Sequence, residues 1–167
     1  VGIDIPADPS GVAPFDWAAD QNFSVEFWMN RSGAITENDV IIGRDDPESS
    51  LHWWVGVDKN GRPTCNLVAT DGNGAAVTGT TNINDGNWHH VVFVRDAVNG
   101  FNMIYIDGNQ TPEGTTPKAS YSAGFGSTTA AINIGWLSLD KKYTYDGIVD
   151  EVALYNNALT ATEIQQH

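Results

Sequence analysis

The stretch 85–108 reads DGNWHHVVFVRDAVNGFNMIYIDG, and its pattern decides the fold class. Two runs rich in β-branched and aromatic residues, 88–96 and 101–107, lie on either side of DAVNG. An Asn-Gly pair between such runs is a strong signal for a β-hairpin, because glycine adopts positive φ without steric cost. We therefore predict two antiparallel strands joined by a tight loop.

The same alternation of short strand-like runs and turn-forming clusters continues in both directions. A second hairpin is predicted across DKNG, and Thr160 stands three residues before Glu163, a capping-box spacing that indicates a short C-terminal helix. The length of 167 residues suits one domain, 1–167, with its own core. The pattern predicts an all-β sandwich or barrel with strands at 1–5, 23–30, 39–44, 51–58, 63–69, 77–82, 88–96, 101–107, 130–136 and 145–155.

The charge of the chain limits its partners. Twenty-one acidic residues against eight basic ones give a formal net charge of -13. Such a surface repels phosphate backbones and anionic lipids, so we expect no nucleic-acid partner and no membrane insertion. The many carboxylates instead suit divalent cations such as calcium.

The adjacent histidines of the opening stretch resemble a catalytic or metal-binding pair, but strand geometry separates them. Side chains alternate along a strand, which puts His90 on one face with Val92 and His89 on the other with Val91. Two imidazoles on opposite faces cannot bind one ligand together, and zinc requires three or four convergent ligands. We therefore predict structural roles for both histidines.

Five motifs in order resemble a known family: FSVEFWMN, DGNWHHVVFVRD, MIYIDG, INIG and YDGIVDEVALYNNALTATEIQQH. Together they resemble a laminin G-like jelly roll of the concanavalin A-like lectin/glucanase superfamily, which includes the pentraxins. The resemblance runs from about Val1 to the C-terminus. It implies a two-sheet antiparallel β-sandwich that is extracellular or at the cell surface, as a domain of a larger secreted protein.

A catalytic role in this superfamily would require spaced carboxylates. Its glucanases carry a Glu-x-Asp-x-x-Glu signature on one strand, which is absent from this chain. The nearest candidates, Asp150 and Glu151, are adjacent, so a regular strand would point them to opposite faces, where they could not flank one sugar ring. We therefore expect a non-catalytic module.

The resemblance also implies a structural calcium ion. Asp150 in GIVDEV matches the family position that supplies a carboxylate, and Gly43 matches one that lends a backbone carbonyl. A second candidate metal site is the acidic loop with Asp45 and Asp46, since calcium takes oxygen ligands. The alternatives are that Asp150 caps a turn and that the loop is an ordinary solvated one.

The aromatic residues suggest where a ligand would bind. In LHWWVGV, strand alternation assigns Trp53 to the core and puts His52 and Trp54 on the other face, where an indole could stack on a sugar ring. Trp136 and Tyr143 are further candidates at the rim, whereas Trp28 and Trp88 resemble core positions of the family. The alternative is that the candidate rings also fill the sandwich.

These observations favour an extracellular module that binds carbohydrate and carries structural calcium. The alternative is an adhesion or spacer module of a larger surface protein, which would bind other surface proteins and have no affinity for sugars.

Overall fold

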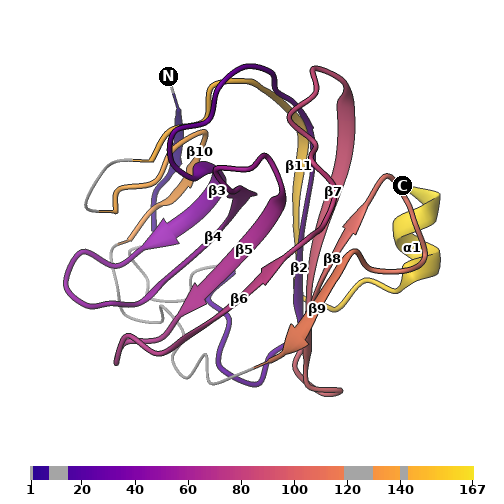
Figure 1. Cartoon of the computed structure of the whole chain (residues 1–167). Coiled ribbons are helices and arrows are strands. Elements are labelled where there is room, and N and C mark those ends of the chain that lie inside the picture. Colours follow the sequence, from indigo (N-terminus) through magenta and orange to yellow (C-terminus); the bar gives the residue numbers. More distant parts are fainter. Residues whose placement is uncertain (1, 8–14, 119–129, 140–142) are drawn as a thin grey trace.

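The computed structural model describes residues 2–7, 15–118, 130–139 and 143–167. Within these residues, all strand pairings are antiparallel and one short helix follows the last strand (Figure 1). The prediction of an all-β fold with a C-terminal helix is confirmed. The elements are β1 (Ile3–Ile5), β2 (Phe23–Asn30), β3 (Asp39–Asp45), β4 (His52–Val57), β5 (Pro63–Val68), β6 (Gly74–Thr78), β7 (Trp88–Asp96), β8 (Phe101–Ile106), β9 (Gly114–Pro117), β10 (Ile132–Ile134), β11 (Ile148–Tyr155) and α1 (Ala161–Gln166).

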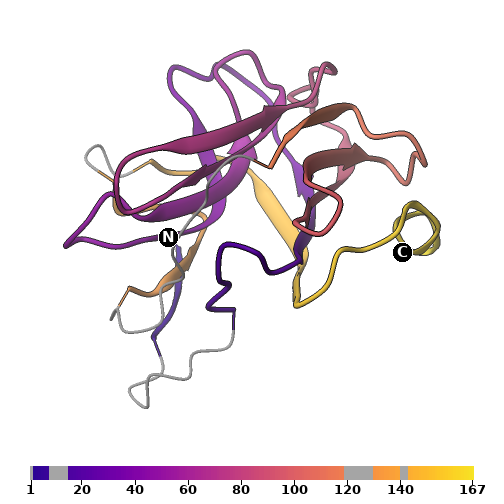
Figure 2. The same ribbon diagram turned by 90° about the horizontal axis from the view of Figure 1, so that it is seen from below.

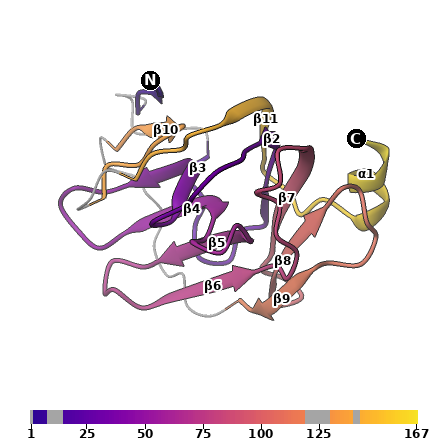
Figure 3. The same cartoon turned by 45° about the horizontal axis from the view of Figure 1, so that its top comes forward.

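In the part of the chain that is described, these strands form two sheets that face each other as a sandwich. The six-stranded sheet has the order β1-β10-β3-β4-β5-β6, and the five-stranded sheet has the order β11-β2-β7-β8-β9. Figures 2 and 3 show the two layers from below and from above, with α1 outside the five-stranded sheet. Among the described residues, no helix is long and apolar enough to cross a membrane.

The main core lies between the sheets and is rich in aromatic residues. Phe27, Trp53 and Phe93 have no exposed surface, and the ring of Trp17 stacks on Phe23 with centroids 4.0 Å apart. Full burial of one large apolar side chain contributes about 1.5–3 kcal/mol. The assignment of Trp53 to the core is confirmed.

A smaller apolar cluster holds α1 against the outer face of the five-stranded sheet. Ile164 of the helix packs with Val92 and Tyr105 of the sheet. The predicted capping box is confirmed: the Thr160 hydroxyl accepts a hydrogen bond from the Glu163 amide at 3.3 Å, and the Glu163 carboxylate accepts one from the Thr160 amide at 2.8 Å. The helix therefore covers part of this outer face.

The histidines of β7 lie on opposite faces, as predicted. His90 is buried on the outer face, whereas His89 lies at the start of the strand between Asp85 and Asp107, at 3.2 and 3.0 Å. Burial lowers the pKa of His89, but the hydrogen bonds to Asp107 and Asp85 outweigh burial and raise it above the ordinary value. His89 thus connects the start of β7 to the end of β8.

Both predicted hairpins form, but their loops differ in detail from a two-residue turn. β4 pairs with β5 and β7 pairs with β8. Gly61 and Gly100 have φ of 73° and 86°, whereas the asparagines before them keep negative φ. The loops are longer than two residues, so one glycine in each adopts the left-handed conformation, and this conformation costs glycine little.

Two edge strands differ from the sequence prediction. β6 spans Gly74–Thr78 instead of 77–82, and β9, Gly114–Pro117, lies where a loop was expected. Both consist mostly of Gly, Ala, Thr and Pro, which have weak or mixed strand propensity. Pairing with β5 and β8 gives these segments their strand conformation, so the local sequence does not reveal them.

Candidate ligand-binding site

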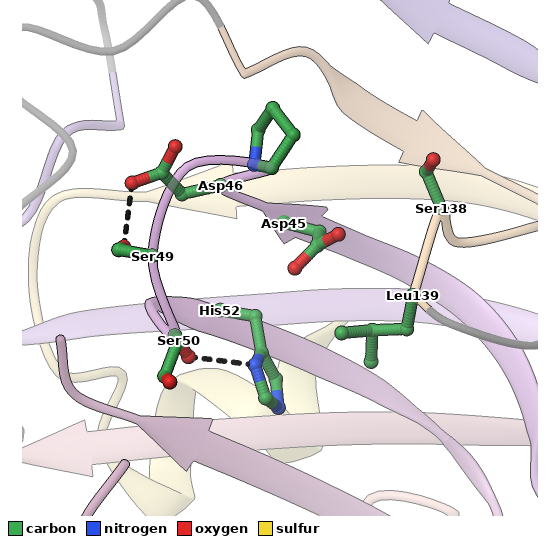
Figure 4. A pocket seen from close by; sticks show the side chains of 8 residues that line it. Asp45, Asp46, Ser49, Ser50, His52, Ser138 and Leu139 are labelled. Atoms are coloured by element: carbon green, nitrogen blue, oxygen red, sulfur yellow. Dashed lines mark hydrogen bonds between the residues drawn. The ribbon is translucent and has the colours of Figure 1, made fainter. Parts of the chain in front are cut away.

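A hollow of about 410 Å³ lies at the end of the six-stranded sheet, where the loop from β3 to β4 meets the segment after β10 (Figure 4). Figure 4 shows the Asp45 carboxylate pointing into this hollow and His52 on its floor. Its described lining residues are Asp45, Asp46, Pro47, Ser49, Ser50, His52, Ser138 and Leu139.

The β3–β4 loop is held by its own hydrogen bonds. Asp46 is buried, and its carboxylate accepts from the Glu48 amide at 3.2 Å and from the Ser49 hydroxyl at 2.6 Å. The Asp46 amide donates to the Leu51 carbonyl at 2.9 Å. Asp46 therefore shapes the loop, whereas Asp45 faces the hollow.

His52 contributes an imidazole to the same hollow. Its Nδ1 lies 2.9 Å from the Ser50 carbonyl. Burial lowers the pKa of His52, and the hydrogen bond to Ser50 opposes this effect only in part. The lowered pKa favours the neutral ring, in which Nδ1 donates to the Ser50 carbonyl and Nε2 can accept a hydrogen bond from a ligand.

A second hollow, of about 230 Å³, adjoins the first and shares Asp45, Pro47 and Ser138 with it. Trp136 and Asp4 also line it. The Asp4 carboxylate accepts hydrogen bonds from the Trp136 indole at 2.8 Å and from the Asn133 amide group at 2.9 Å, so the ring is held in place by β1. We call the two adjoining hollows the Asp45 groove.

Trp54 lies on the outer face of the sheet as predicted, but its ring is 6% exposed. It is buried with Val40 and Leu137, and Tyr143 packs against this cluster. The expectation of an open stacking surface at Trp54 is therefore wrong. Neither Trp54 nor Tyr143 is among the described residues that line the groove.

Gly43 has a packing reason for being glycine. A Cβ atom there would lie 2.8 Å from the Trp53 carbonyl oxygen and 3.0 Å from the Leu137 side chain. The missing side chain lets the 137–139 segment approach the sheet closely, which positions one wall of the groove.

The residues predicted as calcium ligands lie on different sheets. Gly43 is in β3 of the six-stranded sheet, whereas Asp150 is in β11 of the five-stranded sheet and lines a hollow there, so a calcium ion bound by both stays a prediction. Among the described residues, no three His, Cys, Asp or Glu side chains gather as a metal site. Asp45 and Asp46 remain neighbours at the groove.

Two further expectations are wrong for the outer face of the five-stranded sheet. Trp28 and Trp88 do not face the core: they line a hollow on this face together with Asp150 and Glu151. The two carboxylates do not point to opposite faces, because β11 contains a bulge between Asp150 and Ala153.

Sequence reasoning missed a buried carboxylate and its hydrogen-bond partners on the part of this face that α1 covers. Glu26 is 5% exposed, and its carboxylate lies 2.7 Å from His90 Nε2 and 3.1 Å from His167 Nδ1. It also accepts a hydrogen bond from the Tyr155 hydroxyl at 2.7 Å. An acidic residue in the middle of the mostly apolar run FSVEFWMN was the available signal.

Two facing antiparallel sheets form a β-sandwich, which is the architecture of jelly-roll domains, and this sandwich has a groove at its rim. The laminin G family model, described as the concanavalin A-like lectin/glucanases superfamily, matches residues 7–165. The chain belongs to this family, and the resemblance seen in the sequence is confirmed.

Solved structures with the same fold include several binding domains. The CBM40 domain of Ruminococcus gnavus IT-sialidase, bound to alpha2,3 sialyllactose, has a TM-score of 0.74 at 11% identity over 99% of this chain and 95% of that one. Domain 4 of an extracellular arabinanase from Geobacillus stearothermophilus, in complex with arabinotriose, has a TM-score of 0.67 at 21% identity over 99% and 71%. A heptameric pentraxin from Limulus polyphemus has a TM-score of 0.62 at 17% identity over 87% and 68%. No curated protein matches this chain.

Proposed function

We propose that this chain is a non-catalytic extracellular module that binds carbohydrate in the Asp45 groove. One observation carries the proposal: three segments far apart in the sequence bring Asp4, Asp45, His52 and Trp136 to the two adjoining hollows. Fold alone does not assign a function, so the proposal rests on the chemistry of this groove.

The groove offers the groups that recognise a sugar. Carboxylates accept hydrogen bonds from sugar hydroxyls, serine hydroxyls both donate and accept, and the Nε2 of a neutral His52 ring accepts because its Nδ1 donates to Ser50. Trp136 is half-buried, and Asp4 holds its indole in place. The indole therefore loses little conformational freedom when a sugar ring stacks on it. The combined volume of the hollows suits a short oligosaccharide.

The structural neighbours support this class of ligand. The sialidase domain is bound to sialyllactose and the arabinanase domain to arabinotriose. Both have the fold of this chain, and the arabinanase is an extracellular enzyme, which supports an extracellular location here.

The alternative is an adhesion or spacer module that binds other surface proteins at the same rim. A glycan array with the whole chain separates the two functions. A reproducible hit supports the carbohydrate module, and a silent array across neutral and acidic glycans favours the adhesion module.

Replacing Trp136 with alanine is expected to weaken binding of the array-selected glycan at least about tenfold, because a central aromatic anchor contributes 2 kcal/mol or more. Isothermal titration calorimetry measures the change. Phe101→Ala removes another exposed aromatic ring, from β8 of the other sheet, and is expected to leave affinity unchanged. Equal affinity of the Trp136→Ala and Phe101→Ala variants would place the sugar elsewhere.

Calcium is part of the proposal at the groove only, with Asp45 as one carboxylate ligand completed by carbonyls and waters. Calcium at 100 times its dissociation constant would then add about 2.7 kcal/mol to the free energy of unfolding. The melting temperature is expected to rise with added calcium and fall with a chelator, and Asp45→Asn is expected to abolish the difference. Identical melts of the unmodified chain in both conditions would remove calcium from the proposal.

A further inference from the structure

The helix α1 covers only part of the outer face of the five-stranded sheet. On the uncovered part, the paired positions Trp88, Asn30 and Ile148 form one row across β7, β2 and β11, and Trp28 lies in the next row. Trp88 is 45% exposed and Ile148 is 60% exposed. Large apolar surfaces left open at one place on a soluble domain commonly mark a binding site.

A bulge in β11 brings two carboxylates to this aromatic surface. Asp150 pairs with Trp28, but the next pair is Ala153 with Glu26, so β11 has an extra residue there. Glu151 has φ of 51°, and its amide donates to the Asp150 carboxylate at 2.8 Å. A positive φ at a non-glycine residue costs on the order of 1 kcal/mol or more.

The result is a hollow of about 270 Å³ with an aromatic wall and an acidic wall. The described residues that line it are Trp28, Trp88, Asp150 and Glu151. Trp28 is stacked on His90 with centroids 5.1 Å apart, which fixes the orientation of its indole. The hollow is therefore built on strands of the sheet.

The charge of this hollow is uncompensated within the described part of the chain. Several basic side chains of the described residues form ion pairs elsewhere, such as Arg31 with Asp39 and Arg62 with Asp58. None of the described ion pairs includes Asp150 or Glu151. Two carboxylates without a cation, next to indole rings, complement a positively charged group.

We propose that this hollow is a second binding site, distinct from the Asp45 groove, and that it takes a primary ammonium group on an aliphatic carbon. The ammonium lies against the indole of Trp88 and forms charge-assisted hydrogen bonds with Asp150 and Glu151. Two sources carry this chemistry: an amino sugar, and the lysine side chain of a polypeptide.

Paired ligands that differ by one N-acetyl group, and therefore in charge, test the site. The probes are glucosamine against N-acetylglucosamine, and Nα-acetyl-lysine amide against its Nε-acetylated form, because acetylation removes the positive charge in each pair. Each probe is titrated into the whole chain, and the indole N–H signal of Trp88 is followed by NMR. The other indole signals report that the fold is intact.

The expected result is a saturable shift of the Trp88 signal with at least one ammonium probe and an affinity about tenfold lower for its acetylated partner. Binding of glucosamine identifies an amino sugar as the source of the ammonium group, and binding of Nα-acetyl-lysine amide identifies a lysine side chain. Asp150→Asn keeps the acceptor for the Glu151 amide, and Glu151→Gln keeps the size of the side chain, so both variants are expected to fold and to weaken binding about tenfold. Glu48→Gln removes an exposed charge from the β3–β4 loop, away from this hollow, and serves as the matched control.

Three outcomes would overturn the proposal. Equal binding of charged and acetylated probes would define an apolar or neutral-sugar site, and no shift with either ammonium probe would leave the hollow without this ligand. Unchanged affinity in the double variant Asp150→Asn, Glu151→Gln would show that the carboxylates do not bind the ammonium. None of these results depends on whether the Asp45 groove binds sugar.

Discussion

Replacing Glu26 with alanine is expected to lower the free energy of unfolding by about 3–5 kcal/mol, because it breaks a buried, hydrogen-bonded charge cluster. Glu26 accepts hydrogen bonds that originate on β7 and β11 and beyond the end of α1. Without the carboxylate, His90 and the Tyr155 hydroxyl lose their acceptor where little water can replace it. Urea denaturation followed by tryptophan fluorescence measures the change.

Acid provides an independent measurement of the same carboxylate. Burial alone would raise the pKa of Glu26, but hydrogen bonds from His90, Tyr155 and His167 outweigh burial and lower it from 4.5 to about 2. A folded-state pKa below the unfolded value stabilises the fold above pH 4.5, and this stabilisation, about 3 kcal/mol, is lost as the pH falls toward 2. Glu26→Gln is expected to flatten the dependence of stability on pH in this interval.

The matched control is Glu48→Ala, which removes an exposed glutamate from the β3–β4 loop. Its free energy of unfolding is expected to stay within about 0.5 kcal/mol of the unmodified chain. If the Glu26→Ala variant were as stable as the Glu48→Ala variant, the hydrogen bonds to Glu26 would not contribute to the stability of the five-stranded sheet and α1.

The fold was predictable because strong local signals coincide with the long-range pairing. The β-branched run before DAVNG, the Asn-Gly loops and the Thr160 capping box each act over a few residues, and β7, β8 and α1 appear where these signals are. The edge strand β9 carries no such signal, because its conformation comes from pairing with β8. Local chemistry therefore predicts central elements better than edges.

The site was predictable only in part, for the same reason. Strand alternation correctly put Trp53 and Trp54 on opposite faces, but it cannot show that Leu137 covers Trp54 from a segment about eighty residues later. Alternation also failed at Glu151, where a bulge interrupts the period of two. Asp4 was missed because its partners, Asn133 and Trp136, are distant in sequence.

The Asp45 groove and the proposed ammonium site at Trp88 lie on opposite outer faces of one sandwich, so a ligand in one need not exclude a ligand in the other. The core between the sheets separates the Asp45 groove from the hollow at Trp88. A single chain with both sites could hold a glycan on one face and an ammonium-bearing partner on the other, which would suit a module that connects two surfaces.

Replacing Trp54 with alanine is expected to lower the free energy of unfolding by about 3–5 kcal/mol, the usual cost of removing a buried tryptophan side chain. The ring fills the space between Val40 and Leu137, and its loss leaves a cavity under the segment that forms one wall of the groove. Urea denaturation measures the stability, and calorimetry with the array-selected glycan measures binding at a temperature where the variant is folded.

Trp136→Ala is the matched control for this substitution, since it removes the same side chain from a half-buried position at the groove. We expect the two variants to separate: Trp54→Ala loses mainly stability, and Trp136→Ala loses mainly affinity. A Trp54→Ala variant with unchanged stability and abolished binding would contradict this division, because it would mean that Trp54 contacts the ligand directly and that the 137–139 segment moves away from the ring when sugar binds.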